Sequence, residues 1–222
     1  MSETQKRGIF ISFEGGDGCG KTTQRNRLAE ALKALGLRVV TTRELGGTAG
    51  AEALRPDMQS GSVDAWDSIS ELLIVSAGRH DHTEKVIKPA VAAGAWVLSD
   101  RFLDSTTLYQ GYAGSAPLEV VQQVHKIAIG DFRPDLTLIF DIDPQVGLER
   151  ALADAAQRQL NNIEENTRFE RMGLAYHQRV REGFKSILAD NPERCVLIDA
   201  NRDRETIAAE VWSIVAKRFA LS

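Results

Sequence analysis

A short glycine-rich stretch constrains the fold of this chain more than any other part of it. Gly15, Gly20, Lys21 and Thr22 match the pattern G-x-x-x-x-G-K-[ST]. Glycines in such a loop let backbone N–H groups turn towards phosphate oxygens, and the N-terminus of the following helix adds a favourable dipole. An apolar, strand-like run over 8–13 precedes the loop and an amphipathic helical pattern follows it. The stretch therefore predicts a strand–loop–helix unit that binds nucleotide phosphates.

The side chains of this loop suggest how a nucleotide is held. Lys21 supplies a positive charge to the β- and γ-phosphates, and the Thr22 hydroxyl is a ligand for Mg²⁺. We therefore expect ATP and Mg²⁺ as the cofactors. The residues predicted to bind ATP are Gly15, Gly16, Asp17, Gly18, Cys19, Gly20, Lys21, Thr22 and Thr23.

Composition narrows the class of protein. A chain of 222 residues is enough for one α/β domain with at most a small lid. The net charge of -4 gives no broad basic field, so we expect no nucleic-acid partner. The only cysteines, Cys19 and Cys195, suit a reducing compartment without a disulfide framework. A polar N-terminus and the lack of a run of about 18 apolar residues predict a cytoplasmic protein with no membrane partner.

Strand-like and helix-like patterns alternate along the chain. Besides the first strand, the apolar runs that predict strands are 37–42, 96–99, 136–140 and 195–199. Helices are predicted after the glycine-rich loop and over 49–60, 64–92 with a bend near Pro89, 117–130, from Pro144 onwards, and 204–219. This alternation predicts a single P-loop domain over residues 1–222, a three-layer α/β fold whose five-stranded parallel sheet has helices on both faces.

The segment 147–184 is rich in charged and amide side chains. A solvated helical surface is the default interpretation of such a run. The Asn161–Asn162 break and the many arginines equally fit a mobile lid that closes over a triphosphate. We predict a short lid around 150–168.

Charged side chains stand where two predicted strands end. Arg43 follows the second strand, and Asp100 and Arg101 follow the third. Ligands bind at the carboxyl ends of the strands in an open parallel sheet, so we expect these residues beside the phosphate site. A surface charge at Arg43, and a structural ion pair of Asp100 with Arg101, are the alternatives.

A second group of polar residues extends the predicted site. The stretch 104–111 contains Thr106, Tyr109 and Gln110, which suit hydrogen bonding to a sugar or base. Arg79 adds a third arginine to Arg43 and Arg101, more than ATP alone requires. The arginines therefore suggest a second phosphorylated ligand that accepts the γ-phosphoryl group. The four histidines lack the spacing of a metal site: His80 and His82 are two residues apart, whereas His125 and His177 stand alone and are interpreted as surface or half-buried residues.

Four motifs, in this order, resemble those of the thymidylate kinase family of P-loop nucleoside monophosphate kinases. They occupy residues 13–24, 42–48, 100–102 and 109–111, and the similarity runs over nearly the whole chain. The resemblance implies an ATP- and Mg²⁺-dependent phosphotransferase that converts dTMP to dTDP in nucleotide biosynthesis. It also implies a homodimer, for which the helices predicted over 64–92 and 117–130 are candidate interface elements.

The resemblance also assigns roles to particular residues. Asp17 would lie between the two phosphates near Mg²⁺, and Asp100 would orient metal-bound water or the acceptor. The other implied contacts are Arg43 and Arg101 with the acceptor phosphate, Arg79 with a thymine carbonyl, and Tyr109 with the deoxyribose.

Two departures bear on base selectivity. Leu45 stands where the family has proline, and Val75 stands where it usually has a phenylalanine that stacks on thymine. Loss of a stacking ring removes about 1–3 kcal/mol unless another ring replaces it. Phe102 and Phe169 are the candidate replacements. A kinase for another deoxynucleoside monophosphate is therefore the main alternative, and a P-loop ATPase that acts as a switch on a protein partner is less favoured.

A third departure concerns the transferring phosphoryl group. No arginine follows Asp17 in the loop, and relatives of this kind supply a catalytic arginine from the lid. Arg150 matches one lid arginine of the family. Arg158 is our candidate for the catalytic one, with Arg168 behind it.

Overall fold

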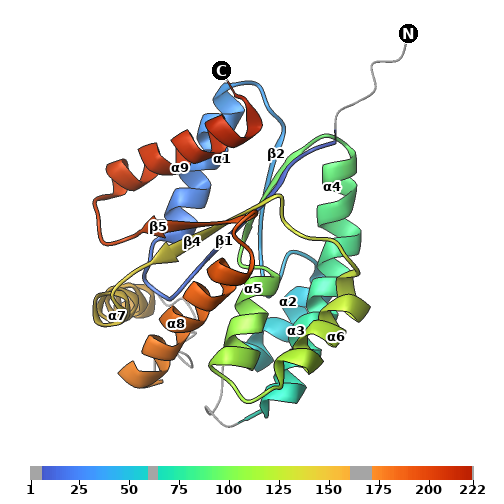
Figure 1. Ribbon diagram of the computed structural model, residues 1–222, viewed down its shortest axis with the longest axis vertical. Coiled ribbons are helices and arrows are strands. Elements are labelled where there is room, and N and C mark those ends of the chain that lie inside the picture. Colours follow the sequence, from blue (N-terminus) through green and yellow to red (C-terminus); the bar gives the residue numbers. More distant parts are fainter. Residues whose placement is uncertain (1–6, 60–64, 161–171, 222) are drawn as a thin grey trace.

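The computed structural model contains a five-stranded parallel sheet with the strand order β2-β3-β1-β4-β5 (Figure 1). The structure describes residues 7–59, 65–160 and 172–221, except for the side chains of 59 and 154–160. The strands are β1 (Phe10–Gly15), β2 (Val39–Arg43), β3 (Trp96–Asp100), β4 (Leu136–Asp141) and β5 (Cys195–Asp199). All five predicted strands are confirmed, and their ends move by no more than about two residues, the usual scatter of element boundaries.

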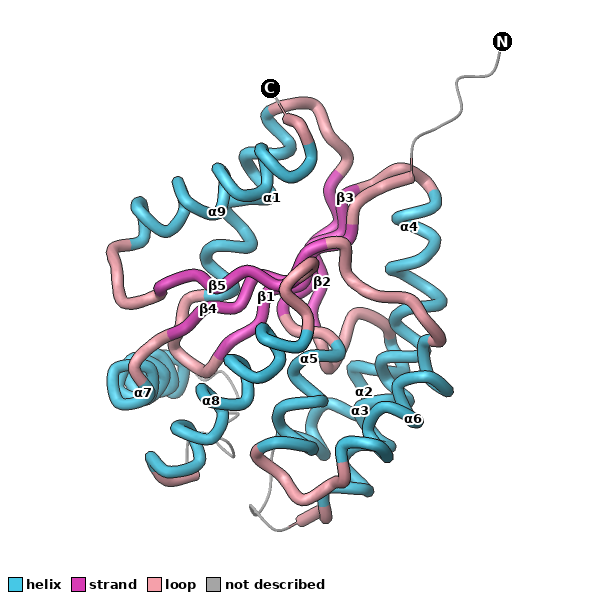
Figure 2. Tube along the Cα trace, in the orientation of Figure 1, coloured by secondary structure: helices cyan, strands magenta, loops and turns pink. Residues whose placement is uncertain are grey.

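Helices cover both faces of this sheet, as predicted (Figure 2). They are α1 (Lys21–Ala34), α2 (Ala49–Gln59), α3 (Ser68–His82), α4 (Lys88–Ala92), α5 (Leu103–Thr106), α6 (Leu118–Ile129), α7 (Pro144–Leu160), α8 (Leu174–Asp190) and α9 (Arg204–Phe219), and two more widely wound segments are η1 (Thr83–Ile87) and η2 (Thr107–Tyr112). None of the helices in the described ranges is long and apolar enough to span a membrane.

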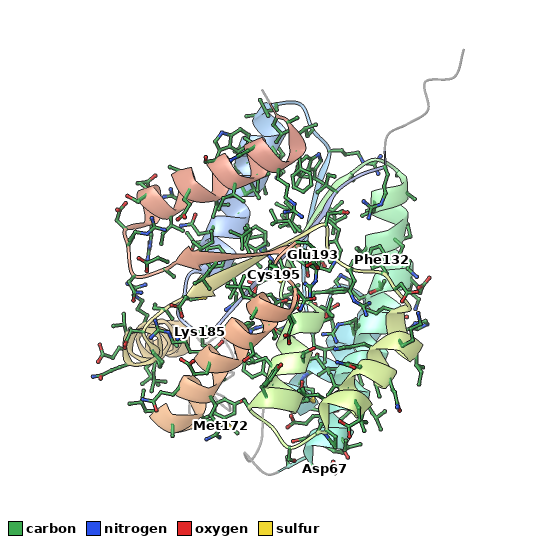
Figure 3. All side chains as sticks on the ribbon, viewed as in Figure 1. Asp67, Phe132, Met172, Lys185, Glu193 and Cys195 are labelled. Atoms are coloured by element: carbon green, nitrogen blue, oxygen red, sulfur yellow. The ribbon has the colours of Figure 1, made fainter. Side chains whose placement is uncertain are left out.

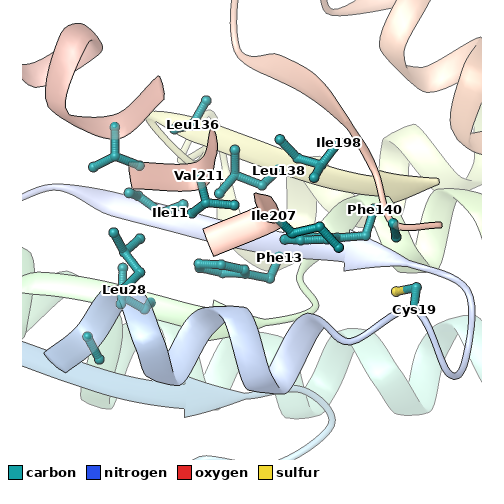
Figure 4. Close-up of a cluster of buried hydrophobic side chains, with 14 of the residues drawn as sticks. Ile11, Phe13, Cys19, Leu28, Leu136, Leu138, Phe140, Ile198, Ile207 and Val211 are labelled. Carbon is teal, nitrogen blue, oxygen red and sulfur yellow. The ribbon is translucent and has the colours of Figure 1, made fainter. Parts of the chain in front are cut away.

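The side chains of β1 alternate between two different environments. Ile11 and Phe13 point into an apolar core formed with α1 and α9, where Ile207 and Val211 pack against them (Figure 4). Phe10 points to the opposite face and packs with residues of η1, α4 and α6. Because successive residues of a strand face opposite sides, Ser12 and Glu14 share the face of Phe10. Both are fully buried there, which places polar groups directly beneath the carboxyl ends of the strands.

The helix predicted over 64–92 is confirmed from Ser68 onwards, with a change of winding near its end. Asp67 caps α3 by accepting hydrogen bonds from the N–H groups of Ile69 and Ser70, both at 2.9 Å (Figure 3). The wider segment η1 leads from α3 into α4, just ahead of Pro89. Proline has no N–H group and its ring clashes with the carbonyl four residues earlier, so a wider turn at this point accommodates it.

The region of the predicted lid is only partly described. α7 begins at Pro144, as predicted from the preference of proline for the first helical position. The predicted lid around 150–168 falls on the second half of α7 and on residues outside the described ranges, and it stays a prediction. α8 then packs on the sheet through Val180 and Phe184, beside the buried Cys195 of β5 (Figure 3).

Candidate active site

The carboxyl ends of the strands open into a cavity of about 1000 Å³. This volume lies at the upper end of the range for small-molecule sites, which leaves room for two ligands. Of the predicted site residues, those that line the cavity are Asp17, Gly18, Cys19, Gly20, Lys21, Thr22, Thr23, Arg43, Val75, Arg79, Asp100, Arg101, Thr106, Tyr109 and Gln110. Gly15 and Gly16 are not among the lining residues, and the Arg158 and Arg168 side chains are outside the described residues.

The glycine-rich loop wraps around the side chain of its own lysine. Lys21 is buried, and its Nζ donates hydrogen bonds to the carbonyl oxygens of Gly15, at 3.0 Å, and Gly16, at 2.8 Å. Gly15 has φ +138°, and a Cβ at this position would lie 2.5 Å from the Phe140 carbonyl oxygen on β4. Only glycine allows the loop to leave β1 this close to the neighbouring strand.

A hydroxyl and a carboxylate meet at the start of α1. The Thr22 hydroxyl donates a hydrogen bond to Oδ2 of Asp100, the last residue of β3. Hard oxygen donors of this kind suit Mg²⁺, which uses one or two protein side chains and completes its shell with phosphates and water. Within the described ranges, no group of three or more His, Cys, Asp or Glu residues forms a metal cage. Thr22 and Asp100 therefore fit Mg²⁺ held together with a nucleotide.

Arg101 connects the two predicted halves of the site. Its Nη2 contacts Oδ1 of Asp17 at 2.7 Å, and its guanidinium lies 5.0 Å from the centre of the Tyr109 ring. Burial by itself raises the pKa of Asp17, but the charges of Arg101 and Lys21 outweigh it and hold this pKa below its ordinary value. Asp17 is therefore a carboxylate that faces the strand-end arginine.

The backbone of Arg101 is left-handed, with φ +69°. Its N–H donates to the carbonyl of Phe13 at 2.9 Å, and its own carbonyl accepts from the Ser99 hydroxyl at 2.7 Å. Non-glycine residues adopt this conformation only where the surroundings hold them in it, which is common in active sites. These bonds aim the guanidinium at Asp17 and at the Ser105 hydroxyl, 3.1 Å away.

Glu14 supports Arg101 from within the core beside β1, a role that was not predicted from the sequence. Its carboxyl group accepts hydrogen bonds from the Phe102 N–H at 2.7 Å and from the Ser105 hydroxyl at 2.6 Å. Burial, and to a lesser extent the Asp104 carboxylate nearby, raise the pKa of Glu14 to about 8. Glu14 thus holds the residue after Arg101 and a hydrogen-bond partner of its guanidinium. The conspicuous acid in the first motif was the only signal of this role.

Arg79 is held by a second buried carboxylate. Its Nε donates to Glu44 at 2.7 Å and its Nη2 to the Phe102 carbonyl at 3.1 Å. Its Nη1 is buried and has no hydrogen-bond partner among the described residues. Arg79 lines the cavity, and its Nη1 is a donor that no described residue uses. Glu44 also contacts Nδ1 of His82 at 3.1 Å.

The prediction that His125 and His177 are surface or half-buried residues is wrong, because both are buried. His82 is buried as well. Polar partners make burial of His82 possible: its Nε2 lies 2.6 Å from the Thr42 hydroxyl, and Glu44 holds its other ring nitrogen. His125 lies 3.1 Å from the Thr107 hydroxyl.

Phe102 does not replace the missing stacking ring beside Val75. Phe102 is fully buried, with its ring centre 4.9 Å from that of Phe10, and it forms no part of the cavity wall. The chain turns at Arg101 so that this ring joins the core beside the sheet instead of facing the cavity. Phe169, the other candidate, lies outside the described residues.

Two further arginines reach the cavity from α1 and α2. Arg25 donates to the Thr42 carbonyl at 2.7 Å, and Arg55 to the Leu45 carbonyl at 2.5 Å. Burial first, and the neighbouring charge of Arg43, lower the pKa of both. Neither arginine was predicted from the sequence to lie in the site. Arg25 follows Lys21 by one helical turn, a spacing that could have placed it, whereas Arg55 depends on how α2 packs.

Arg43 itself is half-exposed and pairs with Glu52 at 3.0 Å. The peptide bond between Glu44 and Leu45, at the position where the family has proline, is cis.

The cavity also extends to the connection between β5 and α9, through Ala200, Arg202, Asp203 and Arg204. This segment carries no recognisable motif. Arg150 of α7 joins it by donating to the Ala200 carbonyl at 3.3 Å.

A phosphate-binding loop that faces strand-end arginines across one cavity, on a parallel α/β sheet, defines a P-loop phosphotransferase. The family model described as thymidylate kinase matches residues 13–211. The thymidylate kinase of Caulobacter vibrioides is 45% identical over 215 residues, covering 97% of this chain and 99% of its own. That of Bradyrhizobium diazoefficiens is 46% identical over 219 residues, covering 99% and 93%.

The solved structures agree with these relatives. The crystal structure of thymidylate kinase from Ehrlichia chaffeensis matches with a TM-score of 0.73 and 34% identity, covering 94% of this chain and 99% of that one. The chain belongs to the thymidylate kinase family. The resemblance carried by the four sequence motifs is thereby confirmed.

Proposed function

We propose that this protein transfers the γ-phosphoryl group of MgATP to dTMP, giving ADP and dTDP for the synthesis of dTTP and DNA. The observation that carries the proposal is that the P-loop and Arg43, Arg79 and Arg101 line one cavity of about 1000 Å³. Two anionic ligands can meet there with their phosphates adjacent.

Positioning and charge neutralisation account for the reaction. A phosphate oxygen of dTMP forms the new bond to the γ-phosphorus while the bond to the ADP oxygen breaks. Lys21 lies at the donor phosphates, and Arg43 and Arg101 hold the acceptor phosphate. Asp17 contacts Arg101 at 2.7 Å and so holds the guanidinium between donor and acceptor. Thr22 and Asp100 would hold Mg²⁺, which neutralises charge on the β- and γ-phosphates when bound.

The base and sugar are recognised at the other end of the cavity. The unpaired Nη1 of Arg79 donates to a carbonyl of thymine, and Tyr109 packs against the deoxyribose where a 2′-hydroxyl would clash. Thr106 and Gln110 complete this end. A kinase for another deoxynucleoside monophosphate is the second candidate, favoured by Val75, which lines the cavity without offering a stacking ring.

A substrate panel tests the proposal. Purified protein with MgATP is assayed with dTMP, dUMP, dCMP, dAMP and dGMP, and we expect the highest kcat/KM for dTMP. A higher value for another monophosphate would establish the second candidate. ATP hydrolysis that no monophosphate changes would instead point to a switch-like ATPase.

We further propose a cytoplasmic homodimer. Exposed apolar side chains on two neighbouring helices support the dimer: Ile69 and Leu73 on α3, and Ile127 on α6. The cytoplasmic location is supported by Cys19 and Cys195, which are both free thiols.

A further inference from the structure

A buried pair of side chains stands at the base-binding end of the cavity. Gln110 of η2 is 3% exposed and lines the cavity, whereas Glu71 of α3 is 7% exposed and lies behind it. Nε2 of Gln110 donates a hydrogen bond to Oε2 of Glu71 at 2.9 Å. Glu71 precedes Val75 and Arg79 by one and two helical turns, so all three lie on one face of α3.

The chemistry of the pair determines which way the Gln110 amide points. A carboxylate only accepts hydrogen bonds, whereas an amide has a donor side and an acceptor side. Glu71 therefore takes the NH₂ group of Gln110. The amide oxygen, Oε1, is then the atom that Gln110 presents to a ligand in the cavity.

Gln110 and Arg79 together define a pattern of hydrogen-bonding groups. Arg79 offers the buried donor Nη1, and Gln110 offers the acceptor Oε1. A base complements this pattern when a carbonyl stands next to a ring N–H, as O4 and N3–H do in thymine. Cytosine carries the reverse arrangement, an amino group beside an unprotonated N3, and would leave both protein groups unpaired.

We propose that Glu71 is a positioning residue for base selectivity: by holding the Gln110 amide in one orientation, it favours a pyrimidine with a ring N–H beside a carbonyl. This inference rests on the proposed function, because it assumes that the base of the acceptor nucleotide lies at this end of the cavity. Burial makes the effect strong, because a buried hydrogen-bonding group that finds no partner discriminates against the wrong ligand.

The experiment compares dTMP with 5-methyl-dCMP, which differs from dTMP only at position 4 and in the protonation of N3. We measure the ratio of their kcat/KM values in the wild-type protein and in Glu71→Gln. The amide introduced by this substitution can donate or accept a hydrogen bond. The Gln110 side-chain amide can therefore flip and present either its oxygen or its NH₂ group to the ligand. We expect the ratio to fall by about tenfold or more, mainly because 5-methyl-dCMP becomes a better substrate.

Three further variants separate positioning from a structural role. Glu119→Gln removes an exposed carboxylate of α6 outside the cavity and should leave the ratio unchanged. Glu71→Gln combined with Gln110→Glu reverses the pair, presents an acceptor again, and should restore the preference for dTMP. Gln110→Leu removes the amide and should lower the ratio, even if Glu71→Gln fails to fold.

The outcomes distinguish this inference from the proposed function. A Glu71→Gln protein that unfolds at a lower temperature but keeps the wild-type ratio would show that Glu71 is structural only. An unchanged ratio in Gln110→Leu would overturn the inference as well. If the wild-type protein does not prefer dTMP in the substrate panel, the proposed function fails, and the inference fails with it.

Discussion

Arg101 shows how strain and function coincide in a single residue. Its left-handed backbone costs free energy that an arginine does not recover by itself. The cost is offset by the hydrogen bond that its N–H donates to the Phe13 carbonyl, by the one that its carbonyl accepts from the Ser99 hydroxyl, and by the contact of its guanidinium with Asp17. Placement of this one charge between the P-loop and the acceptor end therefore depends on β3, which it follows, and on the adjacent β1.

Two substitutions of Arg101 distinguish the effect of its left-handed backbone on stability from the effect of its guanidinium on catalysis. Arg101→Ala and Arg101→Gly both remove the guanidinium, and we expect kcat/KM for dTMP to fall by about 100-fold to 1,000-fold in each. Glycine relieves the left-handed strain, so the glycine variant should be about 1 kcal/mol more stable than the alanine variant in urea unfolding. ATP affinity, measured by titration, should stay close to that of the wild type. An equal loss of ATP affinity would contradict the assignment of Arg101 to the acceptor.

Glu14 gives the stability of the protein a dependence on pH. Its pKa is raised from its ordinary value of 4.5 to about 8. Below the lower value, the carboxyl is protonated in the folded and the unfolded chain alike, and Glu14 contributes no pH dependence. Between the two values the unfolded chain releases the proton and the folded chain keeps it, so stability falls as the pH rises, and above 8 the loss is complete.

Glu14→Gln tests this linkage, since an amide imitates the protonated carboxyl. The variant should become progressively more stable than the wild type as the pH rises from about 5 to about 8, as measured by urea unfolding at several pH values. Glu14→Ala is the contrast: it leaves the Phe102 N–H unpaired and should lose about 1–3 kcal/mol of stability at neutral pH. Parallel pH profiles for the wild type and Glu14→Gln would rule out a titrating Glu14.

At the scale of elements, α3 carries much of the base-binding end. Glu71, Val75 and Arg79 follow one another at intervals of one turn, and His82 continues the same buried side. The helix is anchored at its start by Asp67 and changes winding at η1, ahead of Pro89. A rigid helix of this kind positions side chains more accurately than a loop does, which suits groups that must discriminate between bases.

α7 leads from the P-loop side of the sheet into the predicted lid. If Arg158 supplies the catalytic charge, Arg158→Ala should lower kcat by about 1,000-fold or more while both KM values change by only a few-fold, as for other arginines that act on the transferring phosphoryl group. Arg150→Ala is the matched comparison on the same helix. Arg150 lines the cavity beside Ala200, so its loss should chiefly raise KM for ATP. Steady-state kinetics distinguish the two, and an unchanged kcat in Arg158→Ala would transfer the role to another arginine such as Arg168.

At the scale of the whole molecule, the proposed dimer would cover the outer side of α3 and α6. These helices lie side by side (Figure 1), and on them Leu73 is 55% and Ile127 83% exposed. Lysine at both positions would bury charge in the interface. The double variant with Leu73→Lys and Ile127→Lys should therefore sediment as a monomer. Leu35→Lys, at the exposed end of α1, is the control, and this variant should sediment as the wild type does. A wild-type protein that sediments as a monomer would refute the dimer.

Much of the fold and half of the site follow from patterns that are local in the sequence. The P-loop spans eight residues, so its spacing reveals it directly. Arg43 and Asp100 line the same cavity as the P-loop because each ends a parallel strand, and the two are paired in the sheet register. Arg55 was missed because a single arginine on a helix carries no signal until the packing of that helix is known, whereas the spacing of Arg25, one helical turn after Lys21, could have placed it.

The amino-acid sequence by itself determined the class of fold, the phosphate loop and the family, since each depends on residue types at short spacing. The tertiary structure decided which buried partner orients each reactive side chain: Glu14 beneath Arg101, Glu44 behind Arg79 and Glu71 behind Gln110. These partners come from other strands and helices and meet only when those elements pack. Burial makes each contact strong, and burial is a property of the assembled fold and not of any single segment.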